Sequence, residues 1–342
     1  HVMKRTLAIL IALAMSVMML TACGSKDGTS GTPDNSGDAN QTSTGSYPGN
    51  KNITLYCGYS AGGSSDTLCR LLAAKVGEKL GTTVTVENVT GASGWVMWNQ
   101  MMESTKPDGY SFFLINSPNV TTGKYDPDNT MKYDQNDFEM ICNEVTDSNC
   151  LAIRVDDDRY SDWDSFAAYW KQAGSLITSA SGLGITSDDA TADMLVANDL
   201  GVDVDIIASG GSGDNVTFLL NGTTDFLMGN VSEMVAAHND GQFKILCVFA
   251  EERDSNLPDV PTYEELTGNL VVGCSSRGYA MLKDVPDDIK QILGDAVKAA
   301  VQDPDLIEQL NAIYTTTDYK EGQEYVDYMN QQQQQARETW GV

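Results

Sequence analysis

Three short loops near the start of the folded part hold the groups best suited to binding an anion. They are the first loop, residues 59–66 (YSAGGSSD), the second loop, residues 91–94 (GASG), and the third loop, residues 116–119 (NSPN). Glycine lets a backbone approach a ligand closely, and the N–H groups at a helix N-terminus are free to donate hydrogen bonds to a negative charge. The first loop alone is ambiguous, because single glycine turns are common in α/β proteins.

Strands and helices of the right pattern surround these loops. Residues 53–57 alternate apolar side chains as a strand does, and apolar residues at helical spacing follow from 68 to 76. Strands are also predicted over 82–88 and 111–117, each leading into one of the other two loops. In parallel α/β sheets ligands bind beyond the carboxyl ends of the strands, so we expect the three loops to lie side by side.

The second half of the folded part repeats the order of strand, small polar loop and helix. Strands are predicted over 176–181, 203–208, 225–230 and 244–250, and glycine- and serine-containing loops follow the first two of them. This repetition predicts a second α/β lobe whose loops face those of the first.

Two other segments have a distinctive pattern. Residues 138–145 and 150–155 are predicted as paired strands around a polar turn, which would let Cys142 and Cys150 face each other across a hairpin. A terminal helix is predicted over 325–340, with the glutamine run 331–335 on a solvated face.

The residues give little support for catalysis. Only His1 and His238 are histidines, and His238 stands at a predicted helix end, where it can interact with terminal carbonyl groups. No GxSxG, HExxH or GxxxxGK[ST] motif occurs. A serine-rich pocket without a base lacks an activated nucleophile, so a serine-dependent hydrolase is the less favoured alternative. We predict no enzyme activity and no cofactor.

Composition limits the other classes of function. The formal net charge of −27 and the lack of a basic stripe argue against nucleic-acid binding. The cysteines show no CxxC or Cys/His ligand spacing, which argues against a metal site. The sequence leaves open whether any of the folded part's six cysteines form disulfides: Cys57, Cys69, Cys142, Cys150, Cys247 and Cys274.

The N-terminal residues predict export and a membrane anchor. Lys4 and Arg5 precede an apolar run too short for a comfortable membrane span, so residues 1–22 are predicted to be a signal peptide. Leu20-Thr-Ala-Cys23 resembles a lipobox, with Cys23 as the lipidated residue; ordinary cleavage beside a chance cysteine is the alternative. Residues 23–50 have almost no apolar side chains and are predicted to be a disordered tether. The origin of His1 and Val2 is open.

The order of motifs resembles the extracytoplasmic solute receptors of tripartite tricarboxylate transporters, also called Bug proteins. The matching pieces lie in the family's order and cover essentially all of residues 51–342: YSAGGSSD at 59–66, VENVTGASG at 86–94, KPDGY at 106–110, SGLG at 181–184 and LPDVPT at 257–262. The family's first loop usually carries Pro-Phe where Gly58-Tyr59 stands here, and its second loop usually carries an Arg-Pro that this chain lacks.

The resemblance implies an α/β, two-lobed fold of the periplasmic-binding-protein (Venus flytrap) type, with a ligand cleft between the lobes. Lobe 1 would comprise residues 51–145 and 250–342, and lobe 2 residues 146–249. It also implies a lipid-anchored, monomeric extracytoplasmic receptor that captures a small carboxylate by hinge closure and delivers it to membrane permease subunits. A surface sensor that feeds a signalling membrane protein is the alternative.

The predicted binding groups come from both lobes. Backbone N–H groups at 61–65 and 182–187 would hold one or two carboxylates without an arginine, while Asp66 and Asp188 would cap helices or pair with an ammonium group. The ligand itself cannot be named from these residues. The full predicted set is Tyr59, Ser60, Ala61, Gly62, Gly63, Ser64, Ser65, Asp66, Gly91, Ala92, Ser93, Ser117, Asn119, Gly182, Gly184, Ser187, Asp188, Ser212 and Asn230.

Overall fold

Alternating strands and helices build lobe 1 in a computed structural model that describes residues 47–127, 131–180, 182 and 184–342. The predicted signal peptide, Cys23 and most of the predicted tether lie outside these residues. The first elements are β1 (Ile53–Cys57), α1 (Ser64–Leu80), β2 (Val84–Asn88), α2 (Trp95–Ser104) and β3 (Ser111–Ser117). Strand β1 pairs in parallel with both β2 and β3, so the ends of these strands, and their loops, lie at one edge of the sheet.

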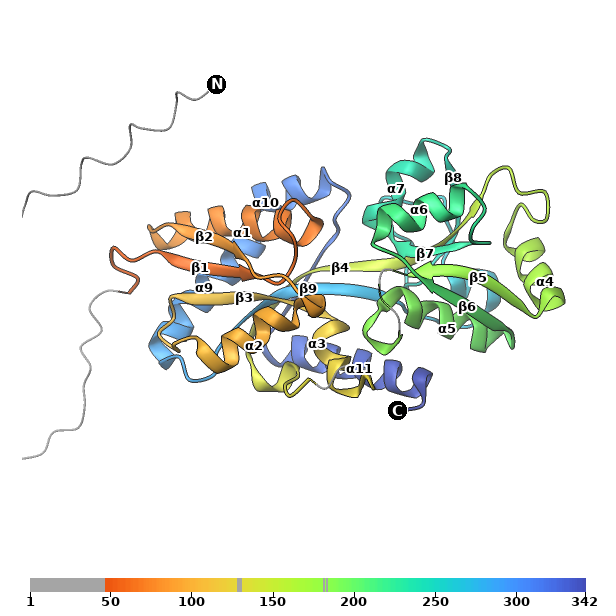
Figure 1. Cartoon of the computed structure of the whole chain (residues 1–342). Helices are drawn as coiled ribbons and strands as arrows, with labels where there is room; N and C mark the ends of the chain where they lie inside the picture. Colours follow the sequence, from red (N-terminus) through yellow and green to blue (C-terminus); the bar gives the residue numbers. More distant parts are fainter. Residues whose placement is uncertain (1–46, 128–130, 181, 183) are drawn as a thin grey trace, which may run out of the picture. The chain divides into compact units, whose positions relative to one another are not determined.

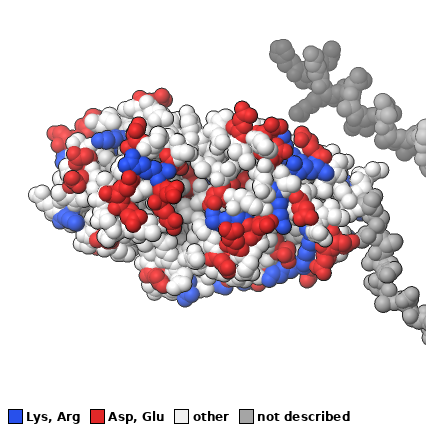
Figure 2. Space-filling view, turned by 180° about the vertical axis from the view of Figure 1, so that it is seen from behind, with Lys and Arg blue, Asp and Glu red and all other residues white. Residues whose placement is uncertain are grey.

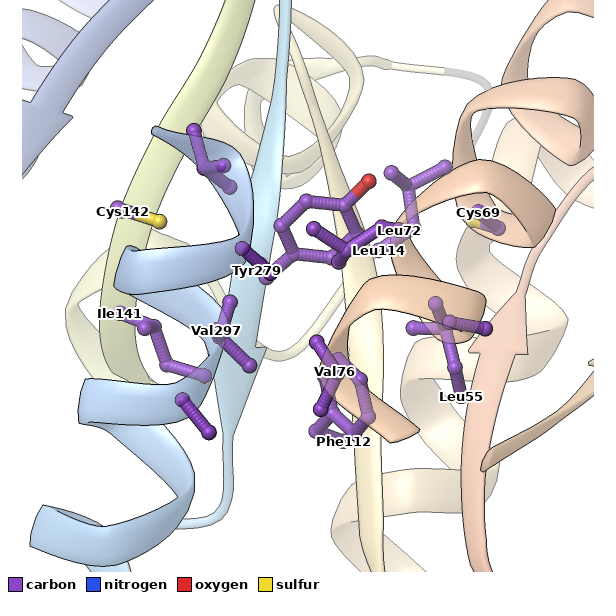
Figure 3. Packing of buried hydrophobic residues seen from close by; sticks show 14 of the residues in the cluster. Leu55, Cys69, Leu72, Val76, Phe112, Leu114, Ile141, Cys142, Tyr279 and Val297 are labelled. Atoms are coloured by element: carbon purple, nitrogen blue, oxygen red, sulfur yellow. The ribbon is translucent and has the colours of Figure 1, made fainter. Parts of the chain in front are cut away.

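Helices cover both faces of this sheet (Figure 1). On one face α1 packs with α9 (Asp287–Val301) and α10 (Pro304–Asn311), and on the other lie α2, α3 (Asn119–Thr122) and α11 (Gly322–Trp340). Figure 3 shows how Leu72, Phe112 and Val297 meet on the first of these faces. Burying each such side chain stabilises the fold by roughly 1.5–3 kcal/mol.

Two antiparallel strands carry the chain between the lobes. Strand β4 (Glu139–Arg154) has 16 residues and pairs with β9 (Cys274–Met281). Its first part also pairs with β10 (Thr317–Glu321) in lobe 1. Its last part pairs with β7 (Leu227–Asn230) and β8 (Phe243–Val248) in lobe 2.

Lobe 2 surrounds an aromatic core. Trp163, Phe166, Trp170, Phe226 and Tyr263 all pack in it. Its remaining strands, β5 (Ser175–Ala180) and β6 (Asp203–Ala208), form a separate parallel pair. Its helices are α4 (Trp163–Ala173), α5 (Asp188–Leu200), α6 (Ser212–Leu220), α7 (Val231–Asn239) and α8 (Tyr263–Thr267). The two-lobed α/β fold expected from the sequence is therefore confirmed.

The predicted hairpin at residues 138–155 is wrong, because β4 runs through without a turn. Cys142 and Cys150 lie eight positions apart on one extended strand, roughly 26 Å at about 3.3 Å per residue. All six cysteines within the described residues are free thiols. The two asparagines that bound the predicted turn are buried and bonded instead: Asn143 Nδ2 donates to the Asp318 carbonyl at 2.7 Å, and Asn149 Nδ2 donates to Asp189 Oδ1 at 3.0 Å.

The return to lobe 1 occurs at β9 and not near residue 250. Leu257 and Val260 pack in a lobe 2 core, and so do Tyr263 and Val271. These apolar side chains hold residues 257–271 in lobe 2, although the sequence placed this segment in lobe 1. Within the described part of the chain, no helix combines the length and apolar character needed to span a membrane.

Glu144 on β4 predicts a specific pH dependence of stability. Its side chain is fully buried and accepts a hydrogen bond from Tyr279 Oη at 2.5 Å. Burial, only partly opposed by that hydrogen bond, raises the pKa of Glu144 to about 8. Between about pH 4.5 and 8 the folded protein therefore holds a proton that the unfolded chain has lost, so the free energy of unfolding falls as pH rises.

We expect Glu144→Gln to reduce this fall, because the amide stays neutral and still offers Tyr279 an acceptor. One pKa unit corresponds to about 1.4 kcal/mol. Urea unfolding at pH 5 and pH 8 measures the difference, with the exposed Glu308→Gln as a matched control. An equal pH dependence in wild type and Glu144→Gln would contradict the prediction.

Candidate functional site

Asp66 shapes the first loop from within. Its carboxylate accepts hydrogen bonds from the Gly62 N–H at 2.8 Å, Arg70 Nε at 2.9 Å and Asn88 Nδ2 at 2.8 Å. Burial alone would raise the pKa of Asp66, but the bonds from Arg70, Gly62 and Asn88 outweigh it and lower the pKa to about 2. Asp66 is thus a charged scaffold for the loop, whereas the N-cap position of α1 is Gly63, with no side-chain cap.

These hydrogen bonds reduce the number of free backbone N–H groups among residues 61–65, which the sequence predicted to bind a carboxylate. The Gly62 N–H is engaged by Asp66, and the Gly63 N–H donates to the Ser60 carbonyl at 3.3 Å. Ser64 and Ser65 form the first turn of the 17-residue helix α1, where N–H groups have no partner within the helix. Ser60 to Ser64 are solvent-exposed, so the edge of the loop is open to a ligand.

The three lobe 1 loops touch one another. A Cβ atom added to Gly58 would lie 2.7 Å from Gly94 Cα, so the first and second loops meet backbone to backbone. Tyr59 Oη donates to the Ser93 carbonyl at 3.2 Å and lies 3.4 Å from Asn119 Oδ1 of the third loop. Ser93 has a φ of +51°, a conformation that costs a non-glycine residue energy. Gly91 and Ala92 complete the second loop as exposed residues.

Lobe 2 reaches this cluster through the start of α5. Asn119 Nδ2 donates to the Thr186 carbonyl at 3.1 Å, a direct bond between the lobes. Ser187 caps α5 by accepting from the Ala190 N–H at 3.2 Å. Gly182 and Gly184 precede this cap, and Gly184 has a φ of +77° that favours glycine.

Asp188 and Asn230, both in the predicted set, are hydrogen-bonded to each other. Asp188 Oδ2 accepts from Asn230 Nδ2 at 2.9 Å and from Asn149 Nδ2 at 3.2 Å. Asn230 Nδ2 also contacts the Asp147 carbonyl at 3.1 Å. Both residues therefore belong to a hydrogen-bond network that includes the crossing strand β4.

Two of the predicted side-chain donors, Ser117 and Ser212, have hydrogen-bond partners outside the predicted site. Ser117 is fully buried, and its Oγ lies 2.8 Å from Gln332 Oε1 of α11. Ser212 Oγ donates to Glu233 Oε2 at 2.5 Å. Neither hydroxyl lies against the first loop.

The sequence predicted that the glutamine run 331–335 lies on a solvated face, but three of its side chains contact other elements. Gln332 contacts Ser117 and Tyr328, Gln333 donates to the Thr121 carbonyl, and Gln335 donates to the Val272 carbonyl at 3.0 Å. These amides attach α11 to β3, α3 and the segment before β9.

The sequence reasoning missed Arg277 on β9. This side chain is buried, with 6% exposure, and its Nε has no hydrogen-bond partner. Its Nη1 lies 3.9 Å from Asp147 Oδ2, and its charge opposes the rise in the pKa of Tyr59 that burial causes. A buried guanidinium with an unused N–H therefore lies between the first loop and the crossing strand.

Asp147, on β4, is the acidic residue that pairs with Arg277. Ser232 donates to it from both its N–H, at 3.1 Å, and its Oγ, at 2.5 Å. Burial raises the pKa of Asp147 to about 6, although Arg277 and Ser232 oppose the rise. A lone arginine in a strand of small and apolar residues, 274–281 (CSSRGYAM), is the signal that would have identified this pair.

The structure contains two cavities beside these residues. The larger, of about 540 Å³, lies between α5, α11, β4 and β10, and of the predicted site residues only Asp188 lines it. The smaller, of about 120 Å³, is lined by Asp189, Ser212, Asn215 and Glu233 in lobe 2. Of the three lobe 1 loops only the third lines either cavity, through Pro118, which agrees with the exposure of the first loop.

On the face drawn in Figure 2, basic and acidic side chains are interspersed over both lobes. Among the described residues no three His, Cys, Asp or Glu side chains are placed to hold a metal ion.

Comparison with known proteins gives one family. A family model described as the tripartite tricarboxylate transporter family receptor matches residues 68–339. A Cupriavidus necator protein, named "UPF0065 protein in gbd 5'region", is 30% identical over 281 residues, which are 81% of this chain and 82% of that protein.

Solved structures show the same fold. A TctC solute binding protein from Polaromonas is 27% identical with a TM-score of 0.72, covering 86% of this chain and 98% of its own. An R. palustris protein solved with adipate is 20% identical with a TM-score of 0.74, covering 86% of this chain and 99% of its own.

The Asp66 scaffold gives a testable stability difference. We expect Asp66→Ala to lower the free energy of unfolding by about 1–3 kcal/mol, because it leaves three donors without their acceptor. Amide hydrogen exchange at Gly62 should become faster. Asp214 is the matched control, since this exposed residue accepts only from the Gly210 N–H, at 3.0 Å, and Asp214→Ala should have a smaller effect. Equal effects of the two substitutions would contradict the scaffold role.

Proposed function

The chain belongs to the tripartite tricarboxylate transporter receptor family, and we propose that it captures a small carboxylate between its lobes and delivers it to membrane permease subunits. In this proposal the protein is a monomeric extracytoplasmic receptor. Lobe 1 comprises the elements up to the first part of β4 and from β9 onward, and lobe 2 the elements between them.

Arg277 is the observation that carries the carboxylate assignment. It is buried beside the first loop, it keeps an Nε without a partner, and its contact with Asp147 is long at 3.9 Å. Arginine binds carboxylates through parallel N–H donors, and such charge-assisted bonds are the strong ones. A ligand carboxylate would satisfy the free donor and add a second counter-charge.

The first loop supplies further donors in this proposal. The first-turn N–H groups of Ser64 and Ser65 carry the positive end of the α1 dipole, which favours an anion. The similarity of the fold to a protein solved with adipate supports the choice of an organic acid as the first ligand class to test.

Hinge closure is the mechanism that the two-lobed arrangement supports. The loops stand on different lobes, and β4 and β9 are the strands through which the lobes can rotate. A ligand that bonds to both sets of loops stabilises the closed form by its additional contacts there. The Asn119–Thr186 bond is a contact of the kind that closure would make or break.

We assign no catalytic role to these residues. His238 Nδ1 accepts from the Ile245 N–H at 3.2 Å, which is a structural contact at the end of α7. The loop serines have no neighbouring base among the described contacts, so a solute receptor is the better supported function.

Attachment to the membrane is proposed from Cys23. It follows the apolar run at the position that a lipidated cysteine takes in a lipobox. Two or more acyl chains on one terminus give stable anchoring, and the segment that follows Cys23 has the composition of a tether.

Replacing Arg277 tests the carboxylate assignment. We expect Arg277→Gln to weaken carboxylate binding about 10- to 100-fold, the effect of losing a charge-assisted hydrogen bond. Calorimetric titration with succinate, malate, adipate and citrate measures the change, and thermal unfolding checks that the variant is folded. Arg253→Gln is the control, since this exposed arginine pairs with Glu265. Unchanged affinity in Arg277→Gln, or a wild type that binds only neutral sugars, would refute the proposal.

Replacing Cys23 tests the anchor. We expect Cys23→Ser, expressed in a bacterial host, to move the protein from the detergent-rich phase to the aqueous phase in Triton X-114 partition. Cys57→Ser is the control, because Cys57 is buried in lobe 1 and outside the lipobox. Partition that is the same with and without Cys23 would contradict lipidation there.

A further inference from the structure

Lobe 2 gathers several carboxylates without matching cations. Asp188 and Asp189 begin α5, Asp193 lies one turn further, and Glu233 is on α7. Burial raises the pKa of Asp189 well above its ordinary value, and the charges of Asp188, Glu233, Asp193 and Asp147 raise it further. Within the described residues no basic side chain forms an ion pair with these four carboxyl groups, and Arg277 pairs with the nearby Asp147.

The small cavity of lobe 2 opens onto this group. Asp189, Ser212, Asn215 and Glu233 line it. Asn215 is 97% buried, with 3% exposure, and its Oδ1 has no hydrogen-bond partner. The Ser212 hydroxyl already donates a hydrogen bond to Glu233. The side-chain oxygens at this cavity are therefore two carboxylates and an unpartnered amide acceptor.

Asn149 does not line this cavity, but it contacts two of the same carboxyl groups. Its Nδ2 donates to both Asp188 and Asp189, which leaves Oδ1 as a second buried acceptor without a partner. A molecule entering the small cavity meets the Asn215 acceptor and the carboxylate of Glu233, so a group that brings donors and positive charge suits it.

An organic cation satisfies this requirement better than a metal ion. No set of three acidic, histidine or cysteine side chains among the described residues converges closely enough to hold a metal. The cavity volume of about 120 Å³ corresponds to about four water molecules at roughly 30 Å³ each. That space accommodates an ammonium group and the carbon that carries it, but no complete ligand.

We propose that the ligand is an amino acid or a similar zwitterion, with its ammonium group bound by Asp189, Glu233 and Asn215 of lobe 2. This inference rests on the proposed function, in which Arg277 and the first loop bind the carboxylate from lobe 1. Each lobe then recognises one end of the molecule, and only a ligand with both charges bridges the two lobes.

Pairs of acids that differ by one ammonium group test the inference. The pairs are L-aspartate with succinate, L-glutamate with glutarate, β-alanine with propionate, and L-phenylalanine with 3-phenylpropionate. We expect at least one amino compound to bind about tenfold or more tightly than its partner in calorimetric titration. Asp189→Asn and Glu233→Gln should each reduce this ratio, while Arg277→Gln should weaken both members of a pair.

Controls separate a fold effect from a charge effect. Glu233 is exposed, so Glu233→Gln removes one charge at little risk to folding, and exposed Glu252→Gln makes the same change away from both cavities. Equal or tighter binding of the deaminated acids would overturn the zwitterion inference and leave the carboxylate receptor intact. A ratio unchanged in both lobe 2 variants would also overturn it. Absence of binding to all eight compounds and to the di- and tricarboxylates would overturn both proposals.

Discussion

Two antiparallel strands, β4 and β9, connect the lobes, and the polar side chains buried along them must find hydrogen bonds in both. In lobe 1 Asn143 bonds to Asp318, and in lobe 2 Asp147 bonds to Ser232 and Asn149 to Asp189. A buried polar group left unpaired costs about 1–3 kcal/mol, so these bonds fix how far each strand extends into each lobe. Arg277 lies on the same pair of strands. The groups that bond the connecting strands and the proposed carboxylate-binding arginine are therefore neighbours.

Local pattern was enough to predict the strand–loop–helix units of lobe 1. The alternation of Ile53, Leu55 and Cys57 and the glycines after them specify β1 and its loop without reference to distant residues. Prediction from the sequence failed where a buried polar side chain bonds to a residue far away in the chain. Asn143 bonds to Asp318, 175 positions away, and a local view of residues 143–149 sees only a polar turn.

The same reason explains the glutamine run and the missed arginine. Gln333 bonds to Thr121, 212 positions away, so its burial has no signature in its own helix. The partner of Arg277, Asp147, is 130 positions distant and was assigned to the supposed turn. The loops of the candidate site could thus be found from glycine and serine, whereas its charges could be found only from the three-dimensional arrangement.

The charge of the whole chain and the charge of the site constrain the ligand together. A formal net charge of −27 disfavours adding an anion, but exposed charges more than about 8–10 Å away are largely screened. The charges close to the proposed site therefore matter most, and they differ between the lobes. Lobe 1 offers Arg277 and the start of α1, whereas lobe 2 offers carboxylates and amide oxygens. A dianion would place its second charge against Asp189 and Glu233. A zwitterion adds no net charge and gives each lobe the sign that it lacks, which a dianion cannot do.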